Sequence, residues 1–83
     1  MYISIEFETK DISECGIDVN DIIRHHDKIL TQDDYIVEDD DMLPDLQTVY
    51  TMIFNNSIFY VVTDGFNNVI RLLNLSKKIE YIV

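Results

Sequence analysis

The chain has 83 residues, of which 47% are hydrophobic and 27% are charged, and its formal net charge at pH 7 is −10. This length suits one domain and excludes two conventional ones, so residues 1–83 are expected to form a single domain. Residues 1–45 contain fourteen acids and three bases, whereas residues 46–83 contain two acids and three bases. The excess negative charge is therefore confined to the first half of the chain.

The N-terminal residues alternate between apolar and polar side chains. Apolar residues occupy positions 1, 3, 5 and 7, and Glu6 and Glu8 lie on the other side. A period of two predicts a half-buried strand, with the two glutamates on its solvent face about 6.8 Å apart. Residues 10–16 predict a turn that ends at Gly16.

Residues 19–31 carry the signals of an amphipathic helix. Asp18 is a candidate N-cap, and Asp21 occupies the third helical position. Ile17 and Ile22 have the spacing of a hydrophobic staple. At 100° per residue one apolar face is predicted, and it consists of Val19, Ile22, Ile23, His26, Ile29 and Leu30.

Residues 33–45 form the densest acidic stretch, with seven acids and no base. Two unit charges ~6 Å apart in water repel by about 0.7 kcal/mol, so seven uncompensated acids repel one another and would be relieved by a cationic surface. A charge run of this kind can also be a solvated loop that serves solubility. Two features favour a contact surface: the whole first half is acidic, and apolar side chains interrupt the stretch. These apolar residues are Tyr35, Ile36, Val37, Met42 and Leu43.

The second half is rich in β-branched and aromatic residues. Residues 48–54 and 58–63 predict two strands joined at Asn55-Asn56, because asparagine tolerates the positive φ of hairpin turns. Asp64-Gly65 predicts the next turn, and residues 69–75 and 78–83 predict two further strands. An alternative makes residues 44–54 a second helix with Pro44 at its first position. Strand propensity favours the first interpretation.

These elements predict an α+β fold, in which a small antiparallel sheet of four to five strands packs against one main helix. The alternative has two helices and a sheet of three to four strands. No basic segment followed by an apolar stretch opens the sequence, and no run approaches the roughly 18 apolar residues of a membrane span. A cytoplasmic location is therefore expected, in a bacterial host if the protein is encoded by a phage.

Candidate chemistry is weak throughout the sequence. His25 and His26 are adjacent and would point about 100° apart on a helix, so one metal would not easily take both, and His26 is expected in the core or at its boundary. The acidic stretch lacks the glycine and the final glutamate of an EF-hand. Cys15 alone provides no disulfide framework and no zinc site, and Gly16 and Gly65 form no phosphate loop. No enzymatic activity, no cofactor and no metal site are predicted.

The charge distribution instead predicts a binding protein. The leading hypothesis is an inhibitor that occupies a basic, nucleic-acid-binding surface of a target enzyme, since duplex DNA itself presents a dense row of negative charges. In size and charge the chain resembles small acidic phage proteins that block restriction or CRISPR nucleases. The alternatives are an acidic adaptor subunit that does not inhibit, an immunity or antitoxin protein that neutralises a basic nuclease, and a domain whose charge serves solubility alone. The predicted partner-binding residues are Asp33, Asp34, Tyr35, Glu38, Asp39, Asp40, Asp41, Asp45, Glu6 and Glu8.

Overall fold

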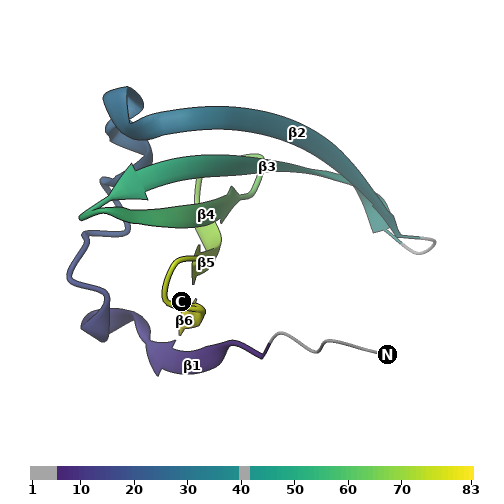
Figure 1. Cartoon of the computed structure of the whole chain (residues 1–83). Helices are drawn as coiled ribbons and strands as arrows, with labels where there is room; N and C mark the ends of the chain where they lie inside the picture. The colour runs from purple at the N-terminus through teal and green to yellow at the C-terminus, as the bar shows by residue number, and fades with distance from the viewer. Residues whose placement is uncertain (1–5, 40–41) are drawn as a thin grey trace, which may run out of the picture.

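The computed structural model describes residues 6–39 and 42–83, and strands dominate it (Figure 1). Three single-turn 3₁₀ segments lie between the first strand and the second. In chain order the elements are β1 (Glu8–Asp11), η1 (Ile12–Glu14), η2 (Ile22–Arg24), η3 (His26–Lys28), β2 (Ile29–Asp39), β3 (Met42–Phe54), β4 (Ser57–Thr63), β5 (Val69–Asn74) and β6 (Ile79–Ile82).

The six strands form one mixed sheet in the order β1-β6-β5-β4-β3-β2. Strands β2 to β6 are antiparallel neighbours in chain order, and β1 joins parallel to β6 at the far edge. In Figure 1 the sheet curves from β2 at the top to β1 at the bottom, and residues 12–28 run down its left side between these two edges. Strands β1 and β2 are therefore the two edges of the sheet.

One face of the sheet carries the hydrophobic core. Met52, Val61 and Leu72 come from three adjacent strands and are fully buried. Cross-strand register brings them together, because Tyr50 lies opposite Val61 and Val61 lies opposite Leu72. Residues 12–28 cover this face with partly buried side chains and with Ile22, which has no exposed surface. The other face is only partly covered, and Ile53, Ile58 and Tyr60 each keep 40% of their surface exposed.

The predicted helix over residues 19–31 is absent, and the α+β prediction is therefore wrong. Within the described residues the structure has no α-helix, and residues 22–28 form two separate 3₁₀ turns divided at His25, whose ψ is 66°. Asp18 does not cap a helix, because its carboxylate accepts the N–H of Asn20 in a local turn. β-branched residues have low helix propensity. Of the predicted apolar face only Ile22 is completely buried. Val19, Ile23 and Ile29 pack against the core while partly buried, and His26 and Leu30 are exposed.

The prediction for His26 is wrong. His26 was expected at the core or its boundary and is exposed, because the helix face that would have buried it does not form. The His25 ring contacts the Phe54 ring edge-on, with centroids 5.6 Å apart. Asp21, four residues before His25, forms an ion pair with Arg24.

The strands of the second half are confirmed, and the alternative of a helix over residues 44–54 is wrong. Strands β3 and β4 meet at Asn55-Asn56, where both residues have positive φ, at 48° and 62°. The sheet is larger than expected and mixed, since β1 pairs in parallel with β6 and residues 29–39 form an additional strand. Residues 1–5, which hold most of the first predicted strand, lie outside the described residues. Within the predicted turn of residues 10–16, Lys10 and Asp11 belong to β1.

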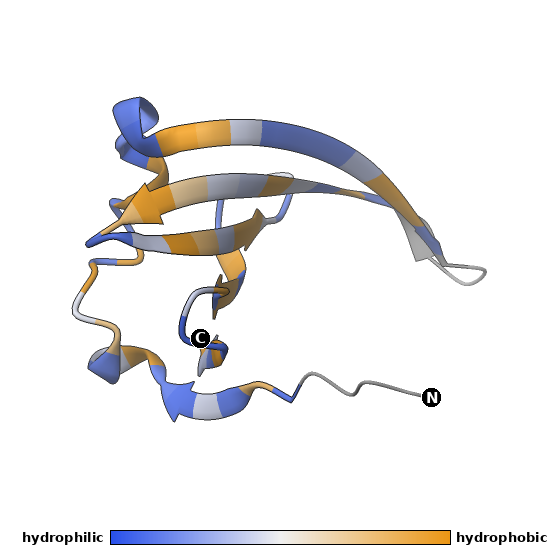
Figure 2. Ribbon diagram, viewed as in Figure 1, coloured by the Kyte–Doolittle hydropathy of each residue, from blue (hydrophilic) through white to orange (hydrophobic). Residues whose placement is uncertain are grey.

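Hydrophobic and hydrophilic residues occur in blocks along β2. Figure 2 shows β2 beginning with hydrophobic residues, passing through a hydrophilic middle and becoming hydrophobic again farther along the hairpin.

No helix of the described residues has the length and apolar character needed to cross a membrane.

Candidate functional site

The hairpin of β2 and β3 extends beyond the rest of the sheet. Strand β4 pairs only with residues 48–54 of β3, whereas residues 42–47 have β2 as their partner strand in the described structure. We call residues 33–39 of β2 and residues 42–47 of β3 the acidic ribbon. In Figure 1 this ribbon projects to the right of strands β4 to β6. The chain thus holds its most acidic stretch away from its own core.

Most of the predicted contact residues lie in this ribbon. Asp33, Asp34, Tyr35, Glu38 and Asp39 belong to β2, and Asp45 belongs to β3. Asp40 and Asp41 lie outside the described residues. The structure corrects the interpretation of residues 33–45 as a loop, because both arms are strands.

Cross-strand pairing explains why an acidic segment forms a strand. Aspartate is disfavoured in strands, but Tyr35, Ile36 and Val37 are strong strand formers at the centre of the segment. Tyr35 lies opposite Gln47, Ile36 opposite Leu46 and Val37 opposite Asp45. The pleat also sends Asp33 and Asp34 to opposite faces, which separates their carboxylates.

Each face of the ribbon combines acids with exposed apolar side chains. Asp34, Ile36 and Glu38 share the face that continues into the core, and Asp33, Tyr35 and Val37 share the other. Ile36 is 70% exposed and Tyr35 is 53% exposed, and Val37 and Leu46 are also exposed. A strand pair with this composition on both faces can contact a partner through charge and apolar area together.

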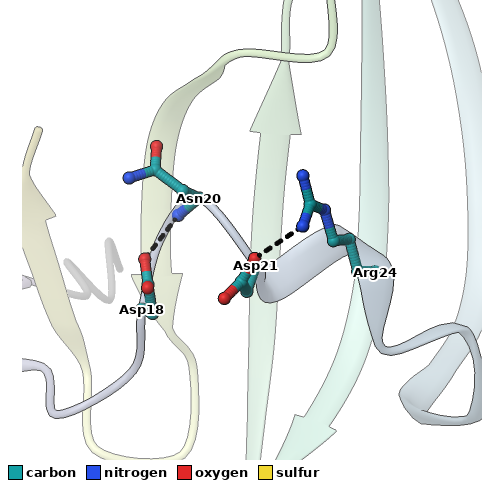
Figure 3. Close-up of polar contacts among 4 residues, drawn as sticks. All are labelled: Asp18, Asn20, Asp21 and Arg24. Carbon is teal, nitrogen blue, oxygen red and sulfur yellow. Dashed lines mark hydrogen bonds and ion pairs between the residues drawn. The ribbon is translucent and has the colours of Figure 1, made fainter.

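The ribbon acids whose side chains the structure describes lack cationic partners, in contrast to Asp21, Asp27 and Glu80. In residues 18–28, Asp21 pairs with Arg24 at 3.2 Å, and Asp18 accepts a backbone N–H (Figure 3). Among the side chains that the structure describes, no ion pair involves Asp33, Asp34, Glu38 or Asp45. Their negative charge therefore remains available to an external cation.

Asp34 has one neutral partner at the base of the ribbon. The hydroxyl of Thr48, a buried residue opposite Asp34, donates to Asp34 Oδ1 at 2.8 Å. This hydrogen bond fixes the orientation of the carboxylate without neutralising it. The ribbon therefore begins with one oriented negative charge beside the core.

Glu6 and Glu8 lie elsewhere on the molecule. Glu8 is the first residue of β1, and its N–H donates to the carbonyl of Lys78. Both glutamates are exposed, but β1 and β2 are opposite edges of the sheet. The structure therefore separates these two predicted contact residues from the ribbon.

Phe66 is a candidate contact residue that the sequence analysis missed. It is 88% exposed, in the turn between β4 and β5. Asp64 holds this turn, because its Oδ1 accepts the N–H groups of Phe66 and Asn68 at 2.9 Å each. These hydrogen bonds lower the pKa of the Asp64 carboxyl, with the Asn68 N–H contributing most. An aromatic residue directly after the predicted Asp64-Gly65 turn was the available signal.

The Phe66 turn lies beside the base of the ribbon. A Cβ added to Gly65 would sit 3.8 Å from the carbonyl oxygen of Leu46. Gly65 therefore lies close to Leu46 of the ribbon, and Phe66 is the next residue along the chain. The ribbon and this turn together form the candidate contact surface.

The remaining groups with metal-binding or nucleophilic side chains are described by their placement and burial. In the part of the chain that the structure describes, no group of three or more His, Cys, Asp or Glu side chains is placed to hold a metal ion. Burial raises the pKa of the Cys15 thiol, which lowers its thiolate fraction at neutral pH. Comparison with protein-family models, with curated proteins and with solved structures finds no match to this chain. Function therefore has to be inferred from the geometry and charge of the chain itself.

Proposed function

We propose that this protein is a binding module that inhibits a target enzyme by occupying its basic, nucleic-acid-binding surface. The observation that carries the proposal is the acidic ribbon, which displays acids without ion pairs next to exposed apolar side chains, outside the folded core. We place the contact on the described ribbon residues Asp33, Asp34, Tyr35, Glu38, Asp39 and Asp45.

The spacing of charge along the ribbon supports a resemblance to nucleic acid. From Asp33 to Asp39 a strand spans about 20 Å at ~3.3 Å per residue. Five acids of β2 and β3 lie along this length, which is roughly one charge per 4 Å. This is close to the charge density of one strand of duplex DNA, one per ~3.4 Å, and about half that of the whole duplex, one per ~1.7 Å of axis. A surface built to bind phosphates at that spacing would therefore meet a similar density of carboxylates.

The apolar side chains support a protein partner over a free polycation. Aromatic residues that become buried at the centre of an interface contribute a large part of binding energy. Tyr35, Ile36 and Phe66 are exposed on the ribbon and on the turn beside it. Charge would steer association, and apolar burial would slow dissociation.

Two matched variants test whether the ribbon is the contact. The ribbon variant combines Asp33→Asn, Glu38→Gln and Asp45→Asn, and leaves Asp34 with its hydrogen bond. The control variant combines Glu14→Gln, Asp21→Asn and Asp27→Asn, which are exposed or half-buried acids outside the ribbon. Each variant changes the net charge by +3. The control variant also removes the ion pairs of Asp21 with Arg24 and of Asp27 with Lys28, which lie at the surface and contribute little to stability.

The experiment measures which proteins of a bacterial lysate bind the immobilised chain and are released by duplex DNA. We expect a basic nucleic-acid enzyme to bind the wild type and the control variant, to bind the ribbon variant at least tenfold more weakly, and to leave as DNA or salt is added. Recovery of no nucleic-acid enzyme would contradict the proposal. A partner that keeps DNA bound in a ternary complex would identify an adaptor instead, and equal losses in both variants would assign binding to net charge rather than to the ribbon.

A further inference from the structure

Strand β2 leaves one backbone edge open. It is the last strand of the sheet, and within the described residues it pairs with β3 alone. Every residue from Leu30 to Glu38 is exposed. In an antiparallel pair about every second residue turns its N–H and C=O away from the neighbour. β2 therefore presents a row of open donors and acceptors, which is a template for another strand.

The other candidate edges are less suited to strand addition. Strand β1 at the far edge has only four residues. The free edge of β3 along the ribbon contains Pro44, which has no N–H to donate. β2 has eleven residues and contains no proline. β2 is therefore the longest edge strand, and no proline in it interrupts main-chain pairing.

Charge excludes a second copy of this chain as the added strand. Within Ile29–Asp39 there are four acids and no lysine or arginine. Like charges directly opposite each other destabilise a strand pair. Pairing two β2 edges would bring eight carboxylates together on chains that each carry a net charge of −10. A cationic strand meets no such repulsion.

The order of side chains along β2 specifies what the added strand must contain. Asp33 and Asp34 lie on opposite faces, followed by Tyr35, Ile36 and Val37, and then by Glu38 and Asp39. A complementary strand carries cations on both faces beside Asp33 and Asp34, a cation beside Glu38, and two or three apolar residues between them. That pattern differs from a uniform polycation.

We propose that the open edge of β2 accepts an extended strand of the basic partner, in which Lys or Arg residues flank a short apolar stretch. The inference rests on the proposed function, because it specifies how the basic partner is held. Main-chain hydrogen bonds extend the sheet, and the flanking cations select the partner. The added strand contacts both faces of the ribbon at the positions where its acids lie.

The probe is the palindromic peptide acetyl-Thr-Lys-Lys-Val-Tyr-Val-Lys-Lys-Thr-amide, which matches β2 in either direction. Its control is the same peptide N-methylated through its five central residues, which keeps the charge and removes the main-chain donors. We expect the control to bind at least tenfold more weakly. With the unmethylated peptide, alternate β2 amides should exchange hydrogen more slowly by NMR.

The possible outcomes separate the two proposals. Equal binding of the two peptides, or amide protection on an edge other than β2, would overturn strand addition and leave binding of a basic partner by the ribbon intact. Binding of neither peptide would also overturn strand addition, whereas the proposed function fails if no nucleic-acid enzyme is recovered from the lysate.

Discussion

The substitutions Ile22→Ala and Ile36→Ala remove the same side-chain atoms, one set from a buried position and the other from an exposed one. Ile22 has no exposed surface and joins residues 12–28 to the sheet, whereas Ile36 is 70% exposed on the acidic ribbon. The first change should destabilise the fold and leave the contact surface in place. The second should leave the fold unchanged and weaken binding.

The expected magnitudes follow from burial. Removing a fully buried isoleucine side chain costs about 2–5 kcal/mol. A chain of 83 residues has a total stability of about 4–12 kcal/mol, so Ile22→Ala removes a large share of it. At roughly 4 °C or more per kcal/mol for a domain of this size, Tm should fall by at least about 8 °C. Ile36→Ala should change the free energy of unfolding by less than about 0.5 kcal/mol.

Thermal and urea unfolding monitored by circular dichroism measures the first half of this prediction. Affinity for the captured partner, measured at a temperature where both variants are folded, measures the second. Ile36→Ala should weaken binding about tenfold if the partner buries this side chain. Equal destabilisation by both substitutions would show that the ribbon is packed against the fold, and would refute the separation of ribbon and core.

Three further predictions concern single side chains. Thr63 is fully buried and its hydroxyl has no hydrogen-bond partner in the described structure, so Thr63→Val should raise the free energy of unfolding in urea by about 1 kcal/mol. Thr48→Val, which loses the hydrogen bond to Asp34, should lower the free energy of unfolding. A loss of stability in both would contradict this assignment. Turn hydrogen bonds lower the folded-state pKa of the Asp64 carboxyl. The stability that Asp64 contributes is therefore present above the pKa of the unfolded carboxyl and is lost as pH falls through the folded value. Asp64→Asn should make Tm less dependent on pH below about pH 4, and an unchanged dependence would refute this. Burial raises the pKa of Cys15, so alkylation by iodoacetamide should reach half its maximal rate at a more alkaline pH in the folded chain than in urea, and identical profiles would disprove the effect.

The strands of the second half could be predicted because local signals agreed there. Residues 48–54 and 58–63 are rich in strand formers, and Asn55-Asn56 between them adopts the positive φ that a tight hairpin needs. Turn chemistry and propensity indicated the same structure. In such a segment the tertiary contacts agree with the local conformational preference of the residues.

The helix prediction failed because spacing alone does not distinguish a helix face from an irregular segment with one anchor. Val19, Ile22 and Ile23 fit a period of 3.6, but they also fit a connection in which Ile22 alone is completely buried. β-branched residues weaken helix propensity. The position of the sheet beneath this segment decided the outcome, and that position depends on distant residues.

Strand β2 could not be read from its own residues. Four acids in eleven residues are typical of an exposed loop, and the pairing of Ile36 with Leu46 is visible only once β3 is in place. The parallel pairing of β1 with β6 joins residues about seventy positions apart and has no local signal. The acidic residues of the candidate site were therefore predictable, whereas their display on an edge ribbon was not.

The most direct test of a nucleic-acid-like ribbon is competition with duplex DNA for the captured partner. We predict mutually exclusive binding: the apparent Kd of this protein for its partner rises in proportion to the DNA concentration. Affinity should also fall steeply with salt for the wild type and the control variant. A stable complex of the partner with both DNA and this protein, or a ribbon variant that competes as well as the wild type, would contradict the account.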